Sequence, residues 1–194
     1  MNILWDFDGT LFDTYPALVK AFIQLSQQPL DSREVLTWLK KDSKTAFKHY
    51  GIPEERRAKY QELYNQYSLL SSEPFPFLED ALAFVDHNII VTHRDRESTM
   101  LLLEKFNLKK YFAEIVSVEE DGYTRKPHSS SYEYVHNKYK LHMAIGDREL
   151  DLVPARSLKI KTAAFQNSNI LADYHLASYM DFKTVILDSF FREK

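Results

Sequence analysis

Short apolar runs alternate along this chain with stretches whose apolar side chains recur at helical spacing. The apolar runs predict buried strands of a parallel sheet over residues 2–7, 89–92, 114–118, 143–147 and 161–166. Helical spacing occurs between them, at Leu78, Ala81, Leu82 and Val85, at Thr99, Leu102, Leu103 and Phe106, and at Tyr132, Val135 and Tyr139. This alternation predicts an α/β fold with a three-layer core around a parallel sheet.

The interval 15–73 interrupts the alternation, because it contains several helical faces in succession and no convincing strand. The three faces are Leu18, Phe22 and Leu25, then Val35, Trp38 and Leu39, then Tyr60, Leu63, Tyr64 and Tyr67. Pro53 is well placed to open the last of these helices, and the prolines of the segment 71–76 disfavour its continuation. We therefore expect a core domain of residues 1–14 and 74–194, with an all-α helical-bundle cap of residues 15–73 inserted into it.

Composition and charge exclude several classes of protein. The 194 residues are 44% hydrophobic and 27% charged, which is typical of a globular protein of one or two domains. A net charge of -3 offers no basic footprint for nucleic acid or an anionic membrane surface. The absence of cysteine excludes disulfides, thiolate ligands and cysteine nucleophiles. Asp6 comes too early for a signal peptide and no run is long enough to span a membrane, so we expect a cytoplasmic protein.

Polar side chains follow three of the predicted strands, at the point where each strand ends. Asp6 and Asp8 follow the first apolar run, Thr92 follows the second, and Asp147 follows the run at 143–146. Because ligands of open α/β sheets bind beyond the carboxyl ends of the strands, we expect these groups to converge on one crevice. Crowded carboxylates raise one another's pKa, and a divalent cation keeps them ionised together. An oxygen-only site favours Mg²⁺, and zinc is the weaker choice.

A lysine and a hydroxyl complete a set of groups suited to phosphate. Lys126, in the loop sequence Arg-Lys-Pro, supplies a positive point charge, and the hydroxyl of Thr92 supplies a neutral donor. The set therefore comprises a carboxylate nucleophile, a second carboxyl group, a hydroxyl, an ammonium and a metal. These are the groups that phosphoryl transfer through an aspartyl phosphate requires.

Taken in order, these residues resemble the four motifs of the haloacid dehalogenase superfamily of phosphatases. The sequence Asp-Phe-Asp-Gly-Thr at 6–10 is similar to the first motif, and Gly-Asp-Arg-Glu-Leu-Asp at 146–151 is similar to the fourth. Thr92 and Lys126 stand where the second and third motifs are expected. The resemblance spans nearly the whole chain, and the helical insertion resembles the α-helical-cap subclass, which includes phosphoglycolate phosphatases and β-phosphoglucomutases. The first and fourth motifs are specific, whereas a lone threonine or lysine is weak by itself.

The resemblance implies a role for each carboxylate. Asp6 would attack phosphorus in line and become transiently phosphorylated, and Asp8 would protonate the leaving alkoxide and then activate water. Asp6, the backbone carbonyl of Asp8, and Asp147 would hold Mg²⁺, with Asp151 helping directly or through a bound water. An alternative interpretation of Asp151 is a first-turn acid that complements the dipole of its helix.

The remaining candidates concern phosphate and substrate. Thr92, Lys126 and the backbone amides around Phe7, Asp8 and His93 would neutralise the transferring group. The side chains of His93, after the candidate phosphate threonine, and of Lys44, clustered with Lys40 and Lys41 between helices of the insertion, are candidate substrate contacts. The competing interpretation of both is an ordinary solvated loop residue.

The chain departs from the family pattern in two places. Residues 128–131, His-Ser-Ser-Ser, replace an acid and a proline, so we expect serine to cap the helix that follows. Lys159 stands where the family usually closes a helix on glycine, which puts a left-handed turn on a lysine. The resemblance further implies a short strand near 175–178, before a helix whose apolar positions are Phe182, Val185, Ile186 and Phe190.

The function that we predict is a Mg²⁺-dependent phosphatase that hydrolyses a small phosphate monoester, of the phosphoglycolate or sugar-phosphate type. The resemblance implies that Asp8 argues against dehalogenation, because members of the family that dehalogenate generally lack a carboxyl group two residues past the nucleophile. An ester leaving group needs a proton, and a halide does not. A phosphosugar mutase shares every core residue and is the close alternative. A phosphoacceptor signalling domain and a non-catalytic binding protein are alternatives of another class. The expected partner is a small phosphorylated metabolite; the oligomeric state stays open, and a monomer is compatible with the sequence.

Overall fold

A six-stranded parallel sheet forms the centre of the larger part of the chain. The computed structural model describes residues 1–188 and orders the strands β3-β2-β1-β4-β5-β6. The strands are β1 (Asn2–Trp5), β2 (His87–Thr92), β3 (Phe112–Ser117), β4 (Met143–Gly146), β5 (Lys161–Phe165) and β6 (Tyr174–Leu176). The predicted parallel sheet is confirmed.

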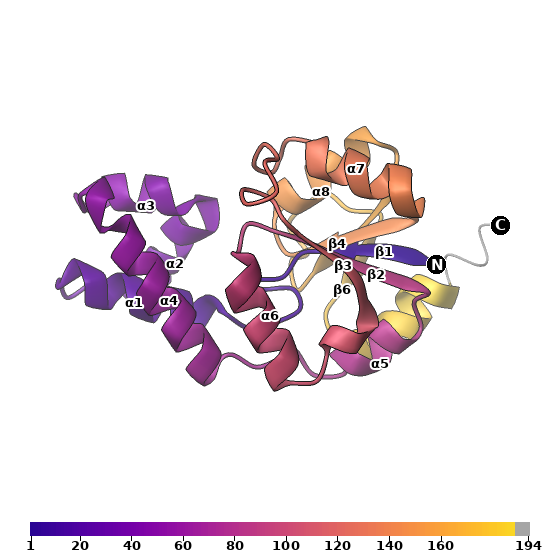
Figure 1. The fold of residues 1–194 in the computed structure, drawn as a ribbon, viewed down its shortest axis with the longest axis horizontal. Helices are drawn as coiled ribbons and strands as arrows, with labels where there is room; N and C mark the ends of the chain where they lie inside the picture. Colours follow the sequence, from indigo (N-terminus) through magenta and orange to yellow (C-terminus); the bar gives the residue numbers. More distant parts are fainter. Residues whose placement is uncertain (189–194) are drawn as a thin grey trace. The chain divides into compact units, whose positions relative to one another are not determined.

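Helices cover both faces of this sheet, which gives the three layers that the sequence predicts. Figure 1 shows α7 (Ser130–Tyr139) and α8 (Glu149–Ser157) on one side, with α5 (Leu78–Ala83) and α6 (Arg96–Lys105) on the other. Successive side chains of a strand point to opposite faces. Ile3 and Trp5 accordingly pack in the apolar cluster with α5 and α6, and Leu4 packs in the cluster with α7 and α8.

A second compact unit, Asp13–Glu73, consists of helices alone. It contains α1 (Tyr15–Ser26), α2 (Ser32–Lys41), α3 (Ser43–His49), the short 3₁₀ helix η1 (Glu54–Arg56) and α4 (Arg57–Ser71). Its own apolar core includes the rings of Phe22, Phe47 and Tyr60, whose centroids lie 5.5 to 5.9 Å apart. The chain is therefore an α/β core with an inserted all-α unit.

Two details of the helical unit differ from the sequence predictions. Helix α3 was not expected, and it follows α2 after a single residue, because Asp42 ends α2 and its carboxylate accepts the amide proton of Thr45 to begin α3. Lys44 therefore lies within α3 and not between helices. The helix after Pro53 also begins later than expected, since the 3₁₀ turn Glu54–Arg56 precedes α4.

The core differs from the predictions at two helices and agrees with them at the end of a third. No serine caps α7, because the hydroxyl of Ser129 donates to Glu133 instead of accepting a backbone amide proton. The expected last helix begins as a 3₁₀ turn, Tyr179–Asp181, and continues as a π-helix, Lys183–Asp188, while Phe190 lies outside the described residues. Lys159 adopts a φ of 60°, the left-handed turn that the glycine position requires.

Candidate functional site

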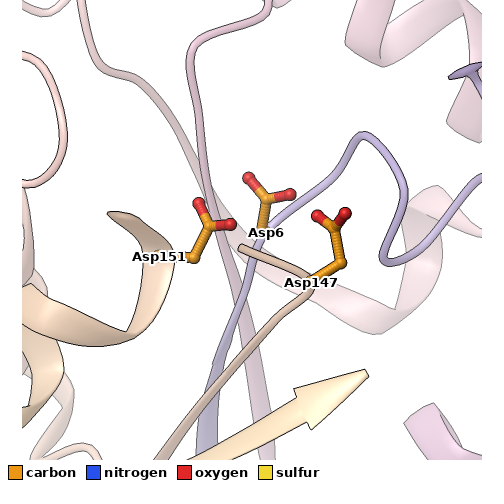
Figure 2. Close-up of side chains that lie close together, drawn as sticks. All are labelled: Asp6, Asp147 and Asp151. Carbon is orange, nitrogen blue, oxygen red and sulfur yellow. The ribbon is translucent and has the colours of Figure 1, made fainter. Parts of the chain in front are cut away.

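The ends of strands β1 and β4 and the first turn of α8 bring three aspartates together. Trp5 pairs with Ile145 in the sheet, and the amide of Asp6 donates to the Ile145 carbonyl at 2.9 Å, so Asp6 and Asp147 leave neighbouring strands at the same level. One carboxylate oxygen from each of Asp6, Asp147 and Asp151 lies within 4.8 Å of the others. Figure 2 shows the three carboxyl groups pointing to the same side.

Gly146 permits the close approach of α8 to strand β4. A Cβ atom at position 146 would lie 2.4 Å from the Cβ of Asp151, a distance at which side chains must move. The glycine of the fourth motif is therefore required for space, because it lets the helix carry Asp151 against the strand end.

Lys126 supplies the positive charge inside this group. Its Nζ donates to Oδ1 of Asp6 and to Oδ1 of Asp151, both at 2.6 Å, and lies 3.2 Å from the carbonyl oxygen of Val91. The side chains of Lys126 and Asp6 are almost completely buried, as is that of Asp151. One ammonium thus bridges two buried carboxylates.

The electrostatics of the group leave an excess of negative charge. Burial raises the pKa of Asp6 to about 7, with the charge of Asp151 adding to the effect and Lys126 opposing it. Burial also acts to raise the pKa of Asp151, but Lys126 and Arg148 outweigh it and the net shift is downward. Arg148 lies 3.8 Å from Asp147 and 3.6 Å from Asp151 and is partly exposed. Oxygen-only ligands with excess negative charge suit a hard divalent cation such as Mg²⁺.

Asp151 has the position that the helix-acid interpretation requires, and its carboxylate also belongs to the candidate metal-ligand group. It lies in the first turn of α8, where its Oδ2 accepts the amide proton of Arg148 at 3.2 Å, as a helix-capping acid does. Its Oδ1 meanwhile accepts from Lys126. The capping bond therefore orients the carboxylate toward the other acidic groups without consuming both oxygens.

Asp8 lies apart from the three clustered carboxylates and has a different partner. Its side chain is 22% exposed and pairs with Arg94, whose Nη1 lies 3.3 Å from Oδ1 of Asp8. The guanidinium of Arg94 is buried and lies 5.8 Å from the centroid of the Phe7 ring. The side chain of Asp8 is outside the candidate metal-ligand group, which leaves its backbone carbonyl as the predicted ligand.

Two residues at the end of β2 connect the loops around the site. Thr92 is buried, and its hydroxyl oxygen accepts the amide proton of Arg94 at 3.0 Å. Nε2 of His93 accepts the amide proton of Lys126 at 3.2 Å, which fixes the loop that carries the lysine. Both residues therefore help to hold the charged groups in place.

One predicted residue lies in the helical unit, and two residues near the carboxylates were not predicted. Lys44 is exposed on α3 of the helical unit, and its substrate role stays a prediction. Sequence reasoning missed Tyr132, whose hydroxyl donates to the Asp151 carbonyl at 2.8 Å, and gave Arg148 no role. Arg148 lies inside the fourth motif, so its position in the sequence could have indicated a role at the site. Tyr132 lies on a helix of the apolar core, and nothing in the sequence distinguishes it from a tyrosine that only packs there.

Comparison with known protein families shows the family to which the chain belongs. A family model described as haloacid dehalogenase-like hydrolase matches residues 3–165. The chain belongs to this family. Members of a hydrolase family are enzymes, so the signalling-domain alternative is set aside. No curated protein matches the chain, and none of the helices formed by residues 1–188 is long and apolar enough to cross a membrane.

Several solved structures share this fold at low sequence identity. A hydrolase from Streptococcus pneumoniae TIGR4 is 26% identical, over 86% of this chain and 93% of that chain, with a TM-score of 0.62. A predicted phosphoglycolate phosphatase from Haemophilus somnus is 20% identical, over 94% of this chain and 96% of that one, with a TM-score of 0.76. A haloacid dehalogenase-like family protein from the pneumococcus is 18% identical, over 97% of each chain, with a TM-score of 0.74.

Proposed function

We propose that this haloacid dehalogenase-like hydrolase is a Mg²⁺-dependent phosphatase that cleaves small phosphate monoesters through a phosphoaspartyl intermediate. The observation that carries the proposal is the group of three buried carboxylates around the buried ammonium of Lys126. Burying charged groups costs free energy of desolvation, so a buried group of this kind points to a function, and phosphoryl transfer requires this combination of charges.

Asp6 is the proposed nucleophile. One of its oxygens accepts from Lys126, and the other lies 3.4 Å from the hydroxyl of Thr10. These contacts hold the carboxylate in one orientation, which favours in-line attack on phosphorus. In that step a bond forms from the Asp6 carboxylate to phosphorus, and the bond from phosphorus to the ester oxygen breaks.

Asp8 is the proposed acid and base. Its partial exposure suits a group that gives a proton to the leaving alkoxide and later takes one from water. The water then attacks phosphorus, releases inorganic phosphate and regenerates Asp6. Arg94 orients the carboxylate of Asp8 through their ion pair, and it is a positioning residue in this scheme.

Lys126, Thr92 and the backbone amides around His93 are the proposed phosphate-binding groups. Asp6, Asp147 and the carbonyl of Asp8 would hold Mg²⁺, aided by Asp151, and the bound ion would supply positive charge that keeps the carboxylates ionised and draws the phosphoryl oxygens in. The expected substrate is a small phosphorylated metabolite in the cytoplasm. The description of the Haemophilus somnus protein as a phosphoglycolate phosphatase supports a substrate of this size.

The proposal is tested by release of phosphate from p-nitrophenyl phosphate, with Mg²⁺ or with a chelator. We expect multiple turnovers with Mg²⁺, none with the chelator, and none in Asp6→Asn. Asp80→Asn is the matched control, because Asp80 is an exposed acid of α5, and it should turn over like the parent. Equal turnover of Asp6→Asn and the parent would refute the assignment.

A second measurement separates the phosphatase from the mutase. A set of phosphorylated metabolites is incubated with the protein and Mg²⁺, and the products are identified. Release of inorganic phosphate indicates a phosphatase. An isomerised sugar phosphate without net release of phosphate would show a mutase instead.

A further inference from the structure

The imidazole of His93 has a tautomer that its hydrogen bond fixes. Nε2 accepts the backbone amide proton of Lys126 at 3.2 Å. A ring nitrogen that accepts a hydrogen bond carries no proton itself. In a neutral imidazole the single ring proton must therefore lie on Nδ1. The geometry therefore makes Nδ1 a hydrogen-bond donor.

The surroundings of the ring keep it neutral. Burial and the charge of Lys126 lower the pKa of His93 to about 2, with smaller contributions from Arg125 and Arg148. An imidazolium beside these cations would be repelled, whereas a neutral ring is not. The donor on Nδ1 is therefore present throughout the physiological pH range.

The Nδ1 atom is buried and contacts no hydrogen-bond acceptor among residues 1–188. Leaving a buried donor without an acceptor costs stability, and native proteins do so rarely. The other ring nitrogen, Nε2, already accepts the amide proton of Lys126. Rotation of the ring to give Nδ1 a new partner would therefore break that hydrogen bond. A donor fixed in this way suits a ligand that brings its own acceptor.

We propose that the Nδ1–H group of His93 binds a phosphoryl oxygen of the substrate. The inference rests on the proposed function, and it concerns the side chain of His93, in addition to the backbone amides around it. A phosphoryl oxygen is the acceptor that fits, because His93 follows Thr92 directly and its Nε2 binds the loop of Lys126, which places the imidazole among the proposed phosphate-binding groups. His93 thus joins two tasks: one nitrogen holds the loop of Lys126 and the other contacts the group that Lys126 neutralises.

Two substitutions separate these tasks. In His93→Asn the amide nitrogen occupies the place of Nδ1, so the donor is kept and the bond to the Lys126 amide is lost. In His93→Gln the amide oxygen reaches the place of Nε2, so the bond to the Lys126 amide is kept and the donor is lost. The assay is kcat/KM for p-nitrophenyl phosphate with Mg²⁺, since the phosphoryl oxygens are the strong acceptors of that substrate.

The inference predicts a loss in kcat/KM of roughly 10- to 100-fold for His93→Gln, the usual effect of removing one hydrogen bond to a charged group. His93→Asn should stay closer to the parent. If His93 served only to hold the Lys126 loop, the order would be reversed, and a reversed order or equal losses in the two variants would overturn the inference. Thermal unfolding of both variants shows whether each is folded.

The Asp6→Asn variant distinguishes failure of this inference from failure of the proposed function. If Asp6→Asn turns over like the parent, the proposed function is wrong whatever the His93 variants do. If Asp6→Asn is inactive and the His93 variants show the reversed order, the phosphatase assignment stands and the role of the His93 donor is wrong.

Discussion

Replacing Lys126 by methionine removes the charge that two buried carboxylates share. The ammonium lies 2.6 Å from an oxygen of Asp6 and 2.6 Å from an oxygen of Asp151, and its side chain is completely buried. Methionine has a similar length and fills much of the same volume. The substitution therefore leaves the carboxylates in place and takes away their common partner.

The expected destabilisation follows from that geometry. Removing one partner of a buried ion pair typically costs about 3–5 kcal/mol, because the remaining charge is left uncompensated. In a chain of this size each kcal/mol lowers Tm by roughly 2–4 °C, which gives a decrease of about 6–20 °C. Lys138→Met is the matched control, because Lys138 pairs with Glu114 at 2.9 Å but is half exposed. A surface pair of that kind contributes little to stability, because solvent screens its charges.

The assay follows unfolding of the core by the fluorescence of Trp5, which is buried in the sheet. A Trp38→Phe background removes the other tryptophan, which belongs to the helical unit. If the carboxylates bind Mg²⁺, the ion should restore more of the lost stability in Lys126→Met than it adds to the parent. A decrease in Tm no larger than that of Lys138→Met, or no response to Mg²⁺, would refute the reasoning.

Three further outcomes are expected from the same site. Gly146→Ala brings a Cβ to 2.4 Å from that of Asp151, so the helix must shift; denaturant unfolding should show a loss of about 1–3 kcal/mol, and phosphate release should fall at least roughly tenfold. With a chelator present, the raised pKa of Asp6 means that the folded state binds its proton more tightly than the unfolded state. Stability should therefore fall as pH rises from the ordinary value of 3.8 to about 7, and in denaturant unfolding Asp6→Asn should lack this slope. Arg94→Met removes the ion pair of Asp8, so activity should fall more for alkyl phosphates, whose alkoxide needs a proton, than for p-nitrophenyl phosphate; equal losses in kcat/KM would contradict this.

The centre of the sheet was predictable because strands β1, β2 and β4 are buried on both faces and are therefore mostly apolar. Trp5, Ile90 and Ile145 belong to three such runs, and they lie in register on adjacent strands. The meeting of Asp6 with Asp147 follows from this register, since the carboxyl ends of parallel strands share one edge. The local hydrophobic pattern and the tertiary structure agree here, so the pattern alone is enough to predict the strands.

Contacts between distant segments could not be predicted in the same way. The pairing of Lys126 with Asp151 depends on how a loop folds back over the strand ends, and no periodicity encodes it. Helix α3 was missed because Asp42 serves two helices at once, so there is no loop sequence between them. The serine cap expected before α7 was wrong because the hydroxyl of Ser129 binds a side chain instead of the backbone.

The claim that Asp6 carries the phosphoryl group during turnover is tested most directly by mass spectrometry of acid-quenched protein. Asp8→Asn is incubated with p-nitrophenyl phosphate and Mg²⁺, because loss of the base should slow hydrolysis of the intermediate. The protein should gain the mass of one phosphoryl group, and fragmentation of the tryptic peptide 1–20 should locate it on Asp6. A chain that releases p-nitrophenol while its Asp6 stays unmodified at every quench time, or that carries the group on another residue, would contradict the account.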